Sequence, residues 1–236
     1  PPKHLFSSLE ADSRKAIVKI QYLEVYNEYI HDLLIPHSEN LDIREDALNG
    51  MAVAHLTEVE TTSLQHTVKL LYEGNARRTV ESTRANEASS RSHAVLQVIV
   101  KIKEAVSGVS AALTVGKLSL VDLAGSERAA ATNNRGMRMV EGANINRSLL
   151  ALGNCINALS DRAKNPHSTK NQYVPYRDSK LTRLLKDSLG GNCHTTMICN
   201  VHPTTGNTMD TSNTLRYAAR ASTIRQRVEK QVRTNP

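Results

Sequence analysis

The stretch Leu118-Ser119-Leu120-Val121-Asp122-Leu123-Ala124-Gly125-Ser126-Glu127 decides how this sequence is interpreted. Its apolar start predicts a buried strand, which ends on one carboxylate with a glycine shortly after it. An acid in that place can hold the hydration shell of a magnesium ion, and a glycine amide can approach a terminal phosphate. A plain buried strand with an ordinary Asp-Gly turn is the alternative, because short motifs often occur by chance.

A second polar segment supports the phosphate hypothesis. Ser89 and Ser90 are adjacent hydroxyls beside Arg91, and such groups can bind phosphate oxygens and a magnesium shell. Alone, this segment would more simply be a solvated loop. A strand is predicted directly after it, over 94–102. If that strand neighbours the one before Asp122, loop and turn converge at one sheet edge, where ligands bind in open α/β sheets.

Strands and helices alternate along the chain, which predicts an α/β sheet with helices on both faces. The polar stretch 128–142 is expected to be mobile. The best helical pattern follows, with Ile145, Leu149, Leu152, Ile156 and Leu159 on one face. The expected strands are one over 16–26 with a short helical turn after it, short ones within 41–60, and one over 195–201. A helix is expected from 64 to about 74 or 80, with Leu64, Val68 and Leu71 inside. Further helices are expected over 144–160, 180–189 and 208–221.

Composition narrows the class of protein. The 236 residues carry a net charge of +7, which suggests an acidic partner. A nucleic-acid binder would rest on this charge alone, since no Trp and one Phe leave little surface for base stacking. The three cysteines show no CxxC spacing and are expected to be reduced thiols of a cytoplasmic protein. No apolar run approaches the length of a membrane span.

The segment Asn86-Glu87-Ala88-Ser89-Ser90-Arg91-Ser92-His93 resembles the first switch of kinesin motor domains, and Asp122 to Glu127 resembles their second switch. Glu141 to Gly153 and Tyr176 to Leu185 resemble two further motifs of that family, in the same order. The resemblance covers 16 to about 224 and is closest to kinesins that regulate microtubule ends. It implies a three-layer, kinesin-type P-loop NTPase fold with a central mixed, mostly parallel sheet, incomplete at the N-terminus.

The resemblance also implies a microtubule-stimulated ATPase with ATP and Mg²⁺ as cofactors. Asp122 would hold magnesium through water, Gly125 would sense the γ-phosphate, and Arg91 would pair with Glu127 when the site closes. The implied catalytic residues are Ser89, Ser90, Arg91, Gly125 and Glu127; those that bind the nucleotide are Asn86, Ser89, Ser90, Asp122 and Gly125, with Ser90 and Asp122 toward the metal.

The implied partner is the microtubule, with Arg177, Lys180 and Arg183 facing the acidic surface of tubulin. From the residues alone, these cations would more simply form a solvated face. The helix over 144–160 would rest on the microtubule and move with the second switch, although its apolar face also fits a plain core helix. Localisation to the cytoplasm and the microtubule cytoskeleton follows from the resemblance, as does a possible dimer through regions outside this chain.

One family motif is missing from the printed sequence. Kinesins carry a phosphate loop, G-x-x-x-x-G-K-[ST], before the strand at 16–26, and Gly116-Lys117 does not match it because the first glycine is lacking and Leu118 follows. We therefore expect residues 1–224 to be a partial motor domain without that loop and the first strands, and 225–236 to be a neck-linker-like basic tail. Weak or no ATP binding and exposed sheet edges are predicted. A non-catalytic microtubule-binding module is the alternative function.

Overall fold

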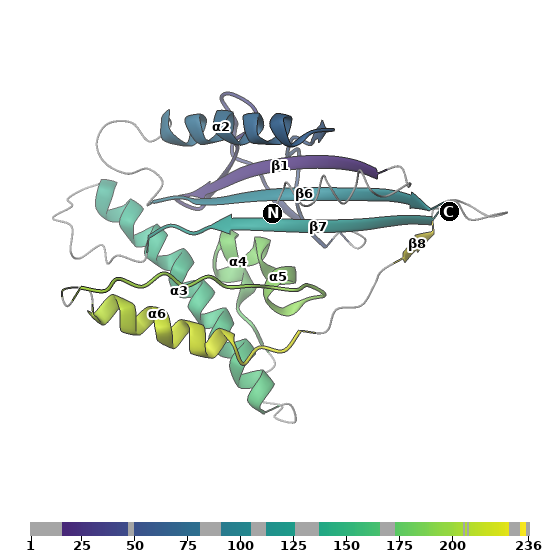
Figure 1. The fold of residues 1–236 in the computed structure, drawn as a ribbon. Coiled ribbons are helices and arrows are strands. Elements are labelled where there is room, and N and C mark those ends of the chain that lie inside the picture. Colours follow the sequence, from purple (N-terminus) through teal and green to yellow (C-terminus); the bar gives the residue numbers. More distant parts are fainter. Residues whose placement is uncertain are drawn as a thin grey trace.

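The computed structural model describes residues 16–46, 50–80, 91–104, 112–125, 137–165, 173–204, 206, 208–226 and 232–234. Its main sheet has six strands in the order β2-β1-β6-β7-β8, with β5 also paired to β1 (Figure 1). These strands are β1 (Ala16–Tyr26), β2 (Tyr29–Asp32), β5 (Val59–Thr61), β6 (His93–Glu104), β7 (Ala112–Asp122) and β8 (Val232–Thr234), while β3 (Ile43–Asp46) and β4 (Gly50–Val53) form a separate hairpin.

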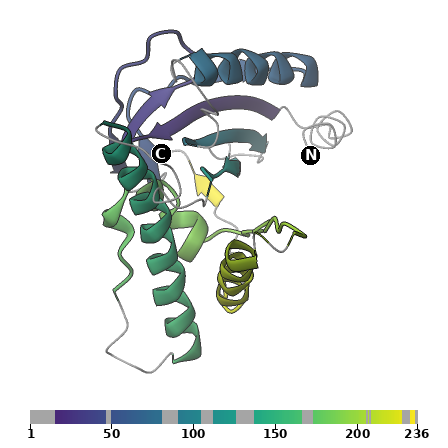
Figure 2. The same cartoon turned by 90° about the vertical axis from the view of Figure 1, so that its left-hand side faces the viewer.

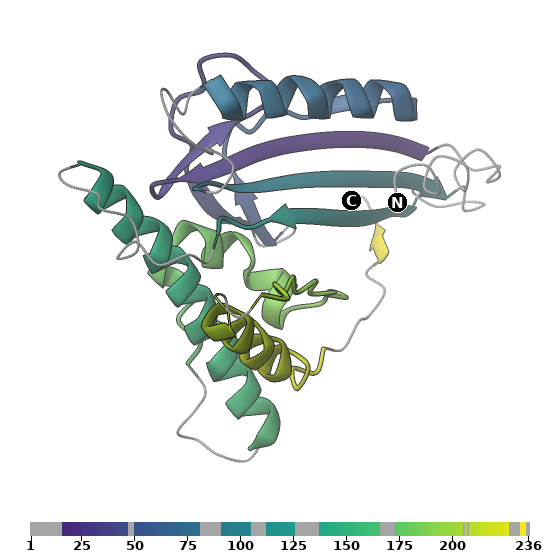
Figure 3. The same cartoon turned by 60° about the vertical axis from the view of Figure 1, so that its left-hand side comes forward.

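Helices lie on both sides of this sheet, as the alternation of elements predicts. Figures 1 and 3 show α2 on one side and the remaining helices on the other. The helices are α2 (Leu64–Val80), α3 (Met137–Lys164), α4 (Lys180–Leu184), α5 (Lys186–Gly190) and α6 (Thr208–Ala221), and Tyr176–Asp178 forms a 3-10 turn. None of the helices in the described ranges is long and apolar enough to cross a membrane.

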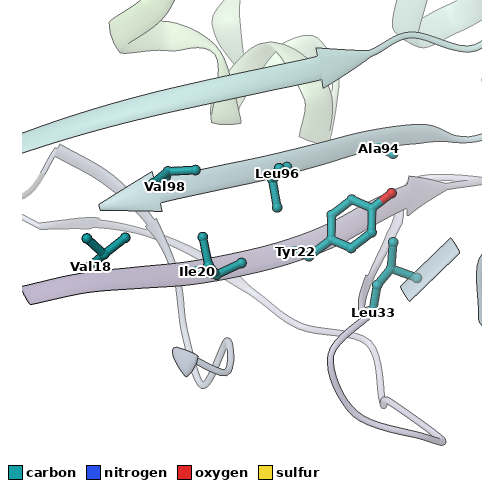
Figure 4. Packing of buried hydrophobic residues seen from close by; sticks show 7 residues of the cluster. All are labelled: Val18, Ile20, Tyr22, Leu33, Ala94, Leu96 and Val98. Atoms are coloured by element: carbon teal, nitrogen blue, oxygen red, sulfur yellow. The ribbon is translucent and has the colours of Figure 1, made fainter. Parts of the chain in front are cut away.

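Alternation along β1 produces the two buried faces of the sheet. Val18, Ile20 and Tyr22 pack with Leu96 of β6 against α2, and Figure 4 shows this cluster. Residues of the opposite parity pack against the β3–β4 hairpin and α4; they include Leu23, Val25 and Val95. The sheet is therefore the middle layer of three, and Figure 2 shows it beneath α2.

The described strands pair only in the antiparallel sense, so the expectation of a mostly parallel sheet does not hold for this part of the molecule. For the pairs β1–β2 and β6–β7, short connections are the physical reason. Two residues join β1 to β2, and residues 105–111 join β6 to β7, whereas a parallel pair needs a crossover of about a dozen residues or more.

The helical turn predicted after β1 is wrong, because a hairpin forms there. Asn27 and Glu28 have φ angles of 52° and 65°, and Tyr26 pairs with Tyr29 across them. Two central residues in the left-handed region characterise a tight hairpin turn, in which asparagine is common and glutamate is rare. The side chain of Glu28 is anchored elsewhere, since its Oε2 accepts a hydrogen bond of 2.8 Å from the backbone N–H of Lys180.

The strand predicted over 195–201 does not form, and the stretch before Asp122 is less buried than expected. The outer edge of β7 pairs with β8 only through residues 112–114, and no other strand in the described part of the chain pairs with it over 115–122. Leu118 is accordingly 43% exposed and Leu120 38%, while Ile198 is 82% exposed. Among the described strands, this part of β7 is therefore an exposed sheet edge, in agreement with the prediction.

The helices match the predictions with three differences. The helix expected over 144–160 begins at Met137, so residues 137–142 are helical rather than loop. The helix expected over 180–189 is divided at Leu185 into α4 and α5, and Ser179 caps α4 through a capping box with Thr182. In α2, Val68 is 36% exposed, and Leu70 lies against the core instead.

Candidate functional site

The start of β6 and the end of β7 lie side by side, because Ala94 is paired with Asp122 in the sheet. The loop before β6 and the turn after β7 therefore meet at one edge of the sheet, as predicted. Of the predicted nucleotide-site residues, Arg91, Asp122 and Gly125 lie among the described residues. The others, Asn86, Ser89, Ser90 and Glu127, lie outside them, and with them the predicted Arg91–Glu127 pair.

Arg78, near the end of α2, joins the two segments. Its Nη1 donates to Asp122 Oδ2 over 2.9 Å, its Nε donates to Ser92 Oγ over 2.9 Å, and its Nη2 donates to the Ser92 carbonyl over 2.8 Å. Arg78 is 7% and Ser92 2% exposed, whereas the Asp122 side chain is 69% exposed. The buried guanidinium thus holds one oxygen of a carboxylate that remains open to solvent.

No motif in the sequence singles out Arg78. Arg77 and Arg78 are adjacent near the end of a helix, where basic residues are common, and no spacing rule distinguishes their roles. In the structure Arg77 turns elsewhere and donates to the Leu33 carbonyl over 2.6 Å. Only the packing of α2 on the sheet decides which of the two reaches Asp122.

His93 makes a second connection at this edge. Its Nδ1 accepts a hydrogen bond of 2.9 Å from the backbone N–H of Ala124, and its Nε2 lies 2.7 Å from Ser148 Oγ on α3. Burial, and secondly the positive charge of Arg78, lowers the pKa of His93 from 6.5 to about 4, with Asp122 acting in the opposite direction. The ring is therefore neutral near pH 7. In the sequence His93 is the last residue of the first-switch motif, and no role of its own was expected for it.

The residues present fit a nucleotide with magnesium. Magnesium keeps several waters and binds through one or two carboxylates together with phosphate oxygens, rather than in a cage of protein ligands. Asp122 offers a solvent-open carboxylate at the end of β7, three residues before Gly125. The described ranges contain no group of three or more His, Cys, Asp or Glu side chains that could hold a metal ion by themselves.

The predicted tubulin-facing cations gather around α4. Lys180 Nζ lies 3.6 Å from Asp42 Oδ1, and Arg183 Nη2 donates to the Ile43 carbonyl over 3.4 Å, so both also contact the segment that leads into the β3–β4 hairpin. Arg177, in the turn before α4, is exposed. Glu28, at the tip of the β1–β2 hairpin, accepts a hydrogen bond from the backbone N–H of Lys180 and so joins the hairpin to α4.

Comparisons with known proteins agree with these features. A family model described as the kinesin motor domain matches residues 2–224. The chain is 52% identical over 228 residues to kinesin-like protein KIF19 of Xenopus laevis, covering 96% of this chain and 22% of that protein. It is 50% identical over 221 residues to kinesin-like protein KIP3 of Saccharomyces cerevisiae, covering 92% of this chain and 27% of that protein. The chain thus spans about a quarter of the length of these relatives.

Solved structures resemble the chain over nearly its whole length. A fast kinesin superposes with a TM-score of 0.85 and 38% identity, covering 99% of this chain and 64% of that chain. A KIF14 dimer in a two-heads-bound state with AMP-PNP, in complex with a microtubule, superposes with a TM-score of 0.86 and 37% identity, covering 97% and 64%. The fold expected from the sequence motifs, a kinesin-type three-layer α/β fold, is confirmed by these likenesses.

Proposed function

Because the chain belongs to the kinesin motor family, we propose that it supplies both nucleotide switches and the microtubule-binding face of an ATP-driven microtubule motor. The relatives named KIF19 and KIP3 are consistent with the resemblance to kinesins that regulate microtubule ends. The protein would act in the cytoplasm on the microtubule cytoskeleton. Residues 1–224 would belong to the motor domain and 225–236 to a basic tail like a neck linker.

One observation carries this proposal: the Arg78 guanidinium joins Ser92 of the first switch to Asp122 of the second. Two loops that must contact the same phosphates need a fixed distance between them, and a buried guanidinium with planar, divergent donors provides it. A resemblance in sequence motifs alone would not require the two segments to be linked in this way.

In the proposed site each residue has the role that the family resemblance implies. Asp122 holds magnesium through water, and Ser90 is the second residue that binds the metal. Gly125 directs its amide to the γ-phosphate, where a side chain would keep the backbone away. Asn86 and Ser89 contact the nucleotide, and Arg91 pairs with Glu127 across the closed site. Bound magnesium neutralises charge on the phosphates.

ATP turnover of the full-length protein, with and without microtubules, tests the nucleotide site. Gly125→Ala is expected to lower the stimulated rate by about 10²-fold or more, as loss of a donor to a developing charge does. Gly116→Ala is the matched control on β7, because a Cβ there meets nothing within 4 Å. Turnover that Gly125→Ala leaves intact would contradict the assigned role.

Microtubule co-pelleting tests the tubulin face. Lys180→Glu with Arg183→Glu is expected to weaken binding strongly at low salt, because the tubulin surface is acidic. The loss of stability should be small, since the Lys180–Asp42 pair has a carboxylate that is 77% exposed and such pairs contribute about 0–1 kcal/mol. Asp42→Asn is the control, since it removes the same pair and keeps both cations. Equal losses in the two variants would show that the hairpin contact, and not tubulin, is responsible.

A non-catalytic microtubule-binding module is the second candidate, and one observation favours it for the printed chain. The 236 residues contain no G-x-x-x-x-G-K-[ST] loop, whose lysine and amides cradle the β- and γ-phosphates in P-loop enzymes. We therefore expect this chain alone to bind ATP weakly or not at all. An in-frame phosphate loop in the upstream coding sequence would favour the motor. ATP turnover by the 236-residue chain itself would contradict our expectation.

A further inference from the structure

His93 lies where three segments of the chain meet. It is the first residue of β6, and its ring is 2% exposed. The ring contacts the backbone of Ala124, which follows β7, and the side chain of Ser148 on α3. Ala124 directly precedes Gly125, so the ring touches both the phosphate-sensing turn of the proposed site and the longest helix of the fold.

The two contacts set the hydrogen on each ring nitrogen. A backbone N–H can only donate, so Nδ1, which lies 2.9 Å from the Ala124 nitrogen, has to be the unprotonated acceptor. In a neutral ring Nε2 then carries the hydrogen and donates to Ser148 Oγ, 2.7 Å away. The imidazole is thus a rigid bridge with one acceptor and one donor, and neither end can be exchanged for the other.

Neither end of the bridge can be released without cost. Ala124 is 5% and Ser148 2% exposed, so water does not replace the ring at either contact. If Ala124 moved away alone, its buried N–H would lose its acceptor and be left unsatisfied, which is costly. A displacement of the Ala124 backbone is therefore followed by the ring, and through Nε2 by Ser148.

We propose that His93 is a positioning residue that transmits the placement of the Ala124–Gly125 backbone to α3 through its two ring nitrogens; this rests on the proposed function, in which that backbone contacts the nucleotide. One turn beyond Ser148, Leu152 packs with Leu181 of α4 and with Tyr217 of α6. The bridge thus connects the nucleotide turn to the helix that supports the cations of the proposed microtubule face.

Amide hydrogen exchange in the full-length protein tests this connection without nucleotide or microtubules. Ser148→Ala removes one end of the bridge and is expected to accelerate exchange of the Ala124 amide, at the other end, by about tenfold, equivalent to about 1.4 kcal/mol. Ser160→Ala is the matched control: Ser160 is also buried on α3, at 1% exposure, but its Oγ is bonded to Thr223. It should leave Ala124 within about twofold of wild type.

Kinetics of the same variants give the second readout. Ser148→Ala is expected to lower the microtubule-stimulated kcat by about tenfold while the KM for ATP stays within about threefold, because the nucleotide contacts themselves are kept. In His93→Asn, the amide oxygen can accept the hydrogen bond from Ala124 in place of Nδ1, but the side chain cannot reach Ser148. Exchange of the Ala124 amide should therefore stay slow, while the microtubule-stimulated kcat falls. Equal acceleration of Ala124 exchange by Ser148→Ala and Ser160→Ala, or a normal kcat in both Ser148→Ala and His93→Asn, would overturn the proposal. Absence of ATP turnover in the wild-type protein would instead refute the proposed function. The exchange result would still decide whether His93 connects the Ala124 backbone to α3.

Discussion

Replacing Arg78 by alanine should destabilise the motor domain by about 3–5 kcal/mol, mainly through Ser92. The exposed fractions of Ser92 and Asp122 decide how this loss of stability divides between the two contacts. Two hydrogen bonds of Arg78 go to Ser92, which is 2% exposed, and the Ser92 Oγ and carbonyl oxygen would be left buried without these donors, at about 1–3 kcal/mol each. Another goes to Asp122, whose side chain is 69% exposed, and an ion pair open to water contributes about 0–1 kcal/mol.

Urea unfolding with two double-mutant cycles measures this partition. Arg78→Ala combined with Ser92→Ala should give a coupling free energy of about 1–2 kcal/mol, and Arg78→Ala combined with Asp122→Ala one below about 1 kcal/mol. Arg77→Ala is the control on the same helix: this side chain is 27% exposed, donates to the Leu33 carbonyl and lies 3.7 Å from Glu73 Oε2, an exposed pair that adds little, so a loss of about 1 kcal/mol is expected. A larger coupling with Asp122 than with Ser92 would refute the argument from exposure.

Three further predictions follow from burial and close contacts. The stability that His93 contributes through its lowered pKa should be fully present above pH 6.5 and fall by about 3 kcal/mol as the pH drops toward 4, measured as the difference between wild type and His93→Asn; a difference independent of pH would contradict it. Gly74→Ala should cost about 1–3 kcal/mol in urea unfolding, because a Cβ would lie 2.4 Å from the ring of Tyr22, whereas Gly116→Ala should be nearly neutral. Cys155 is fully buried and its thiol pKa is raised to about 11, chiefly by burial, so iodoacetamide should modify it last of the three cysteines; equal rates would show that α3 opens readily.

Local patterns were sufficient where neighbouring residues alone decide the structure. The helical pattern from 180 onward predicts a helix start, and α4 begins there, capped by Ser179. Alternating apolar residues predict β1 over the residues where it forms. The predicted convergence of the two polar segments was also correct, because Ala94 and Asp122 are register partners in adjacent strands.

Other features depend on what lies beside a segment. Residues 195–201 have the composition of a strand but no partner in the described part of the sheet, and a strand exists only through hydrogen bonds to a neighbour. Glu28 adopts a left-handed conformation that its residue type disfavours, and its carboxylate is held by the amide of Lys180, 152 residues away. No local window of sequence contains either neighbour.

The sequence by itself determined the family, the segments that would contact phosphate, and most helices and strands, because these follow from motif order and from apolar spacing along the chain. The tertiary structure alone decided that Arg78, and not Arg77, reaches Asp122, and that His93 joins Ala124 to Ser148. The physical reason is that these contacts link residues 31 to 55 positions apart. Their geometry depends on how helices pack on the sheet, which no spacing along the chain encodes.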